Sequence, residues 1–147
     1  MKHPFIIQEY ITDTEARAGK RLLPAEYLLV LQPHKVLWDE IKSIKEKFAA
    51  DYNCEQAKKG LPHITLAVFK QFPATENRIV QSLRNNARML SPFKIEMKNF
   101  GSFPSHTIYI NIVSKVPIMN VVKTLRQNAQ KFMKIDKETI KEDIQIT

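Results

Sequence analysis

The sequence predicts an α+β domain made of two pseudo-symmetric β-α-β halves with a groove between them. Short apolar runs alternate with amphipathic helical stretches, residues 93–113 have the pattern of a β-hairpin, and the apolar pattern of residues 35–52 recurs 81 residues later. With 147 residues, of which 44% are hydrophobic, the chain suits one compact domain. We expect residues 1–25 to form a polar N-terminal arm and residues 26–147 to form this domain.

The first half is predicted to consist of a strand at 27–31, a helix at 35–52 and a strand at 63–69. Pro33 ends the first apolar run, as expected at the end of a short strand. The helix is amphipathic because its apolar residues recur at helical spacing, at Leu37, Ile41, Ile44 and Phe48. Residues 63–69 alternate in polarity, which favours a strand.

A second helix and a hairpin are predicted between the two halves. Thr75 can cap this helix, whose inner face is formed by Ile79, Leu83, Ala87 and Leu90. Residues 93–100 and 106–113 both alternate between apolar and polar side chains. The turn residues GSFPS separate these two stretches, which are therefore predicted to pair as a hairpin.

The second half is predicted as a strand at 106–112, a helix at 117–135 and a closing strand near residue 144. Pro117 suits the first turn of the helix. Adding 81 to the four apolar positions of the first helix gives Ile118, Val122, Leu125 and Ala129, which are all apolar. This weak internal repeat makes the strand near 144 the counterpart of the strand at 63–69.

Composition restricts the class of protein and its partners. The net charge of +8 favours a polyanionic partner such as RNA or a small nucleotide. Cys54 is the only cysteine, which excludes an internal disulfide and indicates a reducing compartment. No apolar run is long enough for a signal peptide or a membrane span, so we expect a cytoplasmic protein that does not bind membranes. No glycine-rich phosphate loop or metal-ligand spacing is present, so we expect no cofactor and no metal.

The stretch LPHITLAVF, residues 61–69, carries the candidate chemistry. Side chains alternate along a strand, so His63, Thr65 and Ala67 are expected on one face and the intervening aliphatic residues in the core. An imidazole can take or give a proton near neutral pH, and a hydroxyl can donate to a phosphate oxygen. This pair therefore suits attack at a phosphodiester without a metal.

PHITL resembles the first motif, His-x-Thr or His-x-Ser, of the 2H phosphoesterase superfamily, which includes 2′-5′ RNA ligases and RNA 2′,3′-cyclic phosphodiesterases. The opening run EYLLVLQP and the hairpin FKIEMKNFGSFPSHTIYINI also resemble this family, so the resemblance covers about residues 26 to 135. It implies a bilobal fold with antiparallel sheets around a central groove, and two such motifs facing each other across it.

The resemblance also implies a function. Members of the family act on 2′,3′-cyclic or 2′-5′ phosphodiester linkages of RNA ends or nucleotides by metal-independent acid/base catalysis. One histidine is the general base, the other protonates the leaving oxygen, and the two hydroxyls hold the phosphate. Carried over to this chain, His63 is an acid–base residue and Thr65 is its phosphate-binding partner.

His106 is the obvious second histidine, but the sequence argues against it. Residue 108 is isoleucine rather than threonine or serine, and His106 shares its strand face with this and other apolar residues. It also lies only 43 residues after His63, about half the separation in the family. Thr107 and Tyr109 occupy the polar face of the same strand, so they are better candidates to line the groove, and Tyr109 can stack on a base.

The repeat places the second motif at residues 145–147, with the sequence QIT. Gln145 lies 82 residues after His63, which fits the family, and Thr147 matches the hydroxyl of the motif. Glutamine can hydrogen-bond a phosphate but cannot transfer a proton. Either the second motif is degenerate, or the chain is a shortened or divergent form without the segment that carries the second histidine. The end at Thr147 favours the second explanation, and in both cases we expect little or no hydrolysis.

Three functions stay open at this point. The first is a phosphodiesterase or RNA ligase-like enzyme that uses His63, with Lys70 steering a phosphate chain toward it. The second is a non-catalytic RNA- or nucleotide-binding protein on the same scaffold. The third is an interaction domain whose basic surface binds a protein partner, in which case His63→Ala would not affect nucleotide binding.

Overall fold

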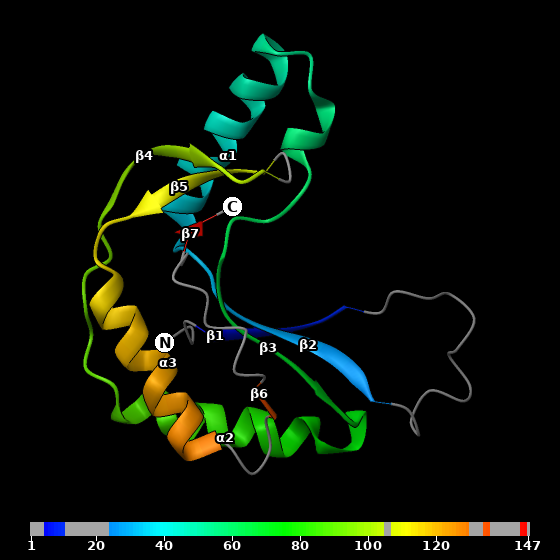
Figure 1. The fold of residues 1–147 in the computed structure, drawn as a ribbon, viewed down its shortest axis with the longest axis vertical. Helices are drawn as coiled ribbons and strands as arrows, with labels where there is room; N and C mark the ends of the chain where they lie inside the picture. Colours follow the sequence, from blue (N-terminus) through cyan, green and yellow to red (C-terminus); the bar gives the residue numbers. More distant parts are fainter. Residues whose placement is uncertain (1–4, 11–23, 105–106, 130–133, 136–144, 147) are drawn as a thin grey trace.

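The computed structural model describes residues 5–10, 24–104, 107–129, 134–135 and 145–146 (Figure 1). The strands are β1 (Phe5–Tyr10), β2 (Ala25–Leu31), β3 (Ile64–Gln71), β4 (Met97–Ser102), β5 (Ile108–Ile112), β6 (Lys134–Ile135) and β7 (Gln145–Ile146). The helices are α1 (Lys35–Asp51), α2 (Glu76–Met89) and α3 (Lys115–Ala129), with the short 3-10 helices η2 (Glu55–Lys58) and η3 (Pro73–Thr75).

The described strands form one antiparallel sheet in the order β1-β2-β3-β7-β5-β4, with β6 also paired to β3. Strands β1 to β3 make one half of the sheet and the β4–β5 hairpin makes the other (Figure 1). The short strand β7 connects the two halves, because it pairs with both β3 and β5. The predicted α+β fold with two antiparallel halves is thus confirmed.

Part of the predicted N-terminal arm belongs to this sheet. Residues Phe5–Tyr10 form β1 and pair with β2 along the whole length of β1, from Phe5 opposite Leu31 to Tyr10 opposite Glu26. The apolar residues Phe5, Ile6 and Ile7 therefore belong to a strand at the edge of the described sheet. The division of the chain at residue 25 into an arm and a domain stays a prediction.

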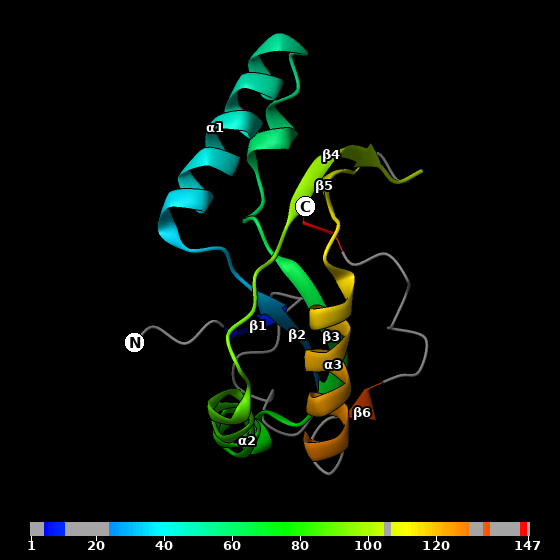
Figure 2. The ribbon, with the colours of Figure 1, turned by 90° about the vertical axis from the view of Figure 1, so that its left-hand side faces the viewer.

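The main core lies between β2 and β3 and the helices α2 and α3, which lie at the end of the molecule opposite to α1 (Figures 1 and 2). Tyr27 and Phe69 stack at its centre with ring centroids 5.4 Å apart. The helices contribute the buried residues Ile79, Leu83, Ile118, Val122 and Leu125. Asn86 is buried between the helices with its hydrogen bonds made, because its Oδ1 accepts from Asn128 Nδ2 at 2.7 Å.

Several boundaries differ from the sequence prediction. The helix predicted at 117–135 includes residues 134 and 135, which form strand β6 instead. The alternation of residues 93–100 predicts a strand from 93, but β4 begins at Met97 and Phe93 is 38% exposed. The backbone of Glu96 instead forms hydrogen bonds with the two residues that follow β5. Its N–H donates to Ser114 Oγ at 2.7 Å, and its carbonyl accepts from the Val113 N–H at 2.9 Å. Helix α3 begins two residues before Pro117, which keeps the proline in the first turn.

A β-bulge interrupts the alternation of β3. Leu29 pairs with Ala67, whereas Val30 pairs with Thr65, so Leu66 is the extra residue. Beyond this bulge Ala67 faces the core with 2% exposure. The predicted grouping of Ala67 with His63 and Thr65 is therefore wrong, since the bulge shifts the alternation by one residue.

The two helices matched by the internal repeat are packed differently. Three of the repeat positions in α3, Ile118, Val122 and Leu125, are 4% exposed or less. In α1, Ile41 is 3% exposed but Ile44 is 43% exposed. Helix α1 rests mainly on η2 and faces the β4–β5 hairpin across an opening.

Phe69→Ala is expected to lower the free energy of unfolding by about 3–5 kcal/mol, because it leaves a cavity beside Tyr27. The matched control is Phe100→Ala, since Phe100 is 61% exposed, and this change is expected to cost less than about 1 kcal/mol. Urea unfolding of both variants measures the difference. Equal losses of stability would contradict the position of the core.

Candidate functional site

His63 lies directly before β3, at the end where β3 pairs with β7. Its ring is partly exposed, and Nδ1 lies 2.7 Å from the carbonyl oxygen of Leu61. A carbonyl can only accept, so Nδ1 donates and carries the proton, which leaves Nε2 free. Leu61 precedes Pro62, which restricts its backbone to extended conformations and so limits where this carbonyl can point. Neutral His63 therefore presents a lone pair at Nε2, and the protonated ring presents an N–H there.

Thr65 is exposed, while its neighbours Ile64 and Leu66 are 2% and 4% exposed. His63 and Thr65 flank the buried Ile64, so both lie on the face of the sheet that turns away from the core. This part of the predicted alternation holds because the bulge lies beyond Thr65. The strand thus offers an imidazole and a hydroxyl on one open face.

Strand β7 brings residue 145 beside this segment. Ile146 pairs with Ile64 on one side and with Ile110 on the other, and Gln145 pairs with Asn111. In an antiparallel pair the residue before Ile146 lies opposite the residue after Ile64, so the backbones of Gln145 and Thr65 are cross-strand neighbours. Residues 65 and 145 are therefore neighbours on adjacent strands at the centre of the sheet. Thr147 and His106 lie outside the described residues.

Tyr109 lies on the same strand as Asn111 and is held by its neighbours in the hairpin. Gly101 pairs with Tyr109, and a Cβ at Gly101 would come within 2.6 Å of the Tyr109 ring. The ring of Phe103 lies 4.5 Å from that of Tyr109, centroid to centroid, and is tilted by 40°. The Thr107 carbonyl accepts from the Phe103 N–H at 2.8 Å, which closes the hairpin. Tyr109 therefore has a fixed position before any ligand arrives.

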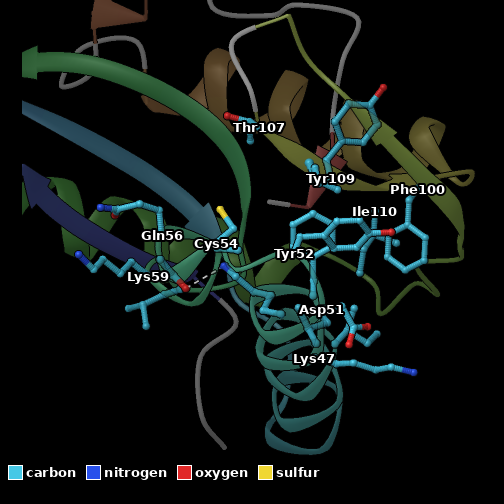
Figure 3. Close-up of a pocket in the computed structure, with 18 of the residues that line it drawn as sticks. Lys47, Asp51, Tyr52, Cys54, Gln56, Lys59, Phe100, Thr107, Tyr109 and Ile110 are labelled. Carbon is cyan, nitrogen blue, oxygen red and sulfur yellow. Dashed lines mark hydrogen bonds between the residues drawn. The ribbon is translucent and has the colours of Figure 1, made fainter.

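A pocket of about 710 Å³ opens between α1, η2 and the β4–β5 hairpin (Figure 3). Its apolar wall includes Ile44, Phe48 and Tyr52 from the α1 side and Phe100, Ile108 and Ile110 from the hairpin. Figure 3 shows Tyr52 near the end of α1, facing Phe100 and Ile110. His63, Thr107 and Tyr109 also line this pocket, so the structure brings three of the candidate residues together.

The structure does not bring Lys70 to this pocket. Lys70 lies at the other end of β3, where its backbone pairs with Glu26 and Lys134. At about 3.3 Å per residue of extended strand, it is roughly 23 Å from His63. Thr65 does not line the pocket either, although it is adjacent to His63 on the open face.

Sequence analysis missed the contribution of α1 to this site. Helical spacing placed Ile44 and Phe48 on the apolar face of the helix, and the structure shows that both line the opening. The signal that could have found it is the cluster Tyr52, Lys59 and Leu61 in the loop region that precedes His63. That loop mixes large apolar and basic residues, and all three line the pocket.

Lys45 is one of three lysines that line the pocket. Its Nζ donates to the Gly60 carbonyl at 3.0 Å, and burial lowers the pKa of Lys45 below its ordinary value. Gly60 has a φ of +102°, a conformation that favours glycine. The bond from Lys45 thus ties α1 to the loop that leads into His63. Within the described residues, no carboxylate forms an ion pair with Lys45.

The described residues contain no group of three or more His, Cys, Asp or Glu side chains that could hold a metal ion. None of the helices in the described part of the chain is long and apolar enough to cross a membrane.

The antiparallel fold with a His-x-Thr segment at its central strand is that of a 2H phosphoesterase-like protein. A protein-family model described as the 2'-5' RNA ligase superfamily matches residues 33–141, more than half of the chain. The chain therefore belongs to the 2'-5' RNA ligase superfamily, which confirms the resemblance noted in the sequence. The matched range includes His63 and Thr65 and ends before Gln145. No curated protein and no solved structure matches the chain.

Gly101→Ala is expected to displace the Tyr109 ring, because the new Cβ would overlap it. The near-ultraviolet circular dichroism should change, and the free energy of unfolding should fall by about 1–3 kcal/mol. The control is the same change in a Tyr109→Ala background, where the overlap is gone and the cost should largely disappear. An equal cost in both backgrounds would show that Tyr109 does not rest on Gly101.

Proposed function

We propose that this protein binds 2′,3′-cyclic or 2′-5′ phosphodiester linkages of RNA ends or small nucleotides and turns them over weakly, without a metal. The observation that carries the proposal is the His-x-Thr segment of a superfamily member in which Nδ1 of His63 is held by the Leu61 carbonyl. This bond leaves Nε2 as the atom that transfers a proton. The net charge of +8 supports a polyanionic ligand.

For a 2′,3′-cyclic phosphate, the reaction would begin with water attacking phosphorus. Nε2 of His63 takes the water proton as the new phosphorus–oxygen bond forms, and the bond from phosphorus to one ribose oxygen breaks. The hydroxyl of Thr65 donates to a phosphate oxygen and stabilises the charge that develops on it. Tyr109 stacks on the base, and Thr107 contributes a hydroxyl at the edge of the site.

The leaving ribose oxygen needs a proton, and this requirement limits the rate. In the proposed arrangement, position 145 lies opposite the first motif, where the family has its second histidine. The glutamine in this chain can hold the phosphate by hydrogen bonding but cannot supply the proton. Solvent must then protonate the leaving oxygen, and the loss of one acid–base group costs roughly 10²–10⁴ in rate.

A second candidate is a non-catalytic RNA- or nucleotide-binding protein on the same scaffold. The glutamine at position 145 favours it, because a site that keeps its phosphate-binding groups and lacks a proton donor can retain its ligand. The two candidates differ in whether any 2′,3′-cyclic AMP is opened when protein is in excess.

His63→Ala is expected to abolish the slow opening of 2′,3′-cyclic AMP and of an oligonucleotide that ends in a cyclic phosphate, because it removes the only proton acceptor proposed. Single-turnover assays with excess protein, read by chromatography, measure this. His34→Ala is the matched control, since His34 lies at the start of α1, where its Nδ1 accepts from the Leu37 N–H. Equal rates for wild type and His63→Ala would exclude His63 from the chemistry.

Gln145→His is expected to raise the rate by roughly 10²–10⁴, because it supplies the missing proton donor. The gain should disappear when His63→Ala is added, since acid and base act together. A Gln145→His variant that still binds 2′,3′-cyclic AMP in equilibrium dialysis and gains no turnover would favour the non-catalytic candidate.

A further inference from the structure

The pocket beside α1 has the exposed apolar lining that is typical of a binding site. Five large apolar side chains around it are strongly exposed, at 43% for Ile44, 70% for Tyr52, 50% for Leu61, 61% for Phe100 and 45% for Ile108. Single exposed apolar residues are ordinary, but a cluster around one opening marks a place where a ligand binds. The volume of about 710 Å³ lies within the range of small-molecule sites.

The charged residues of the lining favour a negatively charged ligand. Lys45, Lys47 and Lys59 line the pocket, and Asp51 is the only carboxylate among the described lining residues. None of the three lysines forms an ion pair within the described part of the chain. Lys45 uses one of its three donors on the Gly60 carbonyl, and its lowered pKa reflects an ammonium group removed from water. A bound anion would compensate this partly buried charge.

We propose that the pocket binds one free amphiphilic anion, a molecule with an apolar aliphatic or aromatic body and a single anionic head. The body lies between α1 and the β4–β5 hairpin, against Ile44 and Ile108, and the head lies at Lys45. The isoleucine and phenylalanine side chains of the lining would contact this body, and they carry no group that could read the edge of a base. His63, Thr107 and Tyr109 also line this pocket, so the proposal adds a ligand class at the site of the proposed function, and its test does not rely on the phosphodiester chemistry of His63.

The test uses n-octyl sulfate as the charged probe and 1-octanol as its uncharged match, each titrated calorimetrically into the full chain. We expect saturable 1:1 binding of octyl sulfate and at least tenfold weaker binding of octanol. Lys45→Gln should reduce the affinity for octyl sulfate to that for octanol, and Ile108→Ser should weaken both. The matched controls, Lys123→Gln and Val116→Ser on exposed positions of α3, should leave both affinities unchanged.

Three results would overturn the proposal. The first is no saturable binding of octyl sulfate, or equal losses in the pocket and control variants. The second is binding of adenosine 5′-monophosphate, in place of octyl sulfate, with the same dependence on Lys45 and Ile108. The third is self-association in sedimentation that Ile108→Ser abolishes, which would assign the surface to a second copy of the chain. The phosphodiester proposal is judged separately, by the hydrolysis rates of His63→Ala and Gln145→His.

Discussion

The arrangement of the site depends on the pairing of Ile146 with both Ile64 and Ile110. Strand β7 is only two residues long, yet within the described residues it is the strand that joins the β1–β3 half of the sheet to the β4–β5 hairpin. Because side chains alternate along strands, this pairing also sets which residues share a face with Thr65. A shift of β7 by one residue would change which residue of β7 has its backbone opposite Thr65. The register of one short strand therefore determines what lies opposite the His-x-Thr segment.

The two halves of the fold differ in how completely their helices bury apolar side chains. Helix α3 buries Ile118 and Leu125 against the sheet, together with α2, and this half carries the main core. Helix α1 has a similar apolar pattern, but it stands off from the hairpin and leaves Ile44 at the wall of a pocket. Elements with incomplete apolar burial are those that can bind a ligand or adjust to it. The internal repeat in the sequence thus corresponds to two helices with similar apolar patterns and different burial.

Helical spacing predicted the position of α1 to within one residue, because a 17-residue amphipathic helix gives a strong periodic signal. The same spacing could not tell whether Ile44 meets a packed core or an open pocket, since that depends on the distance to the hairpin. The bulge at Leu66 was also hidden, because Ala67 is small and apolar and suits either face of a sheet. The proximity of residues 145 and 65 followed from the repeat. The hydrogen bond from His63 to Leu61 depends on loop geometry that no sequence pattern specifies.

The geometry at His63 and the residue at position 145 together define what such a site can do. The Leu61 carbonyl fixes the proton on Nδ1, so Nε2 is available in both protonation states of the ring. A single imidazole could serve as both base and acid only if Nε2 reached the attacking water and then the leaving ribose oxygen. In the in-line displacement of a cyclic phosphate the entering and leaving oxygens lie on opposite sides of phosphorus, so one ring cannot serve both. In the proposed reaction, the lack of a proton donor at position 145 would therefore lower the rate far more than the affinity for the phosphate.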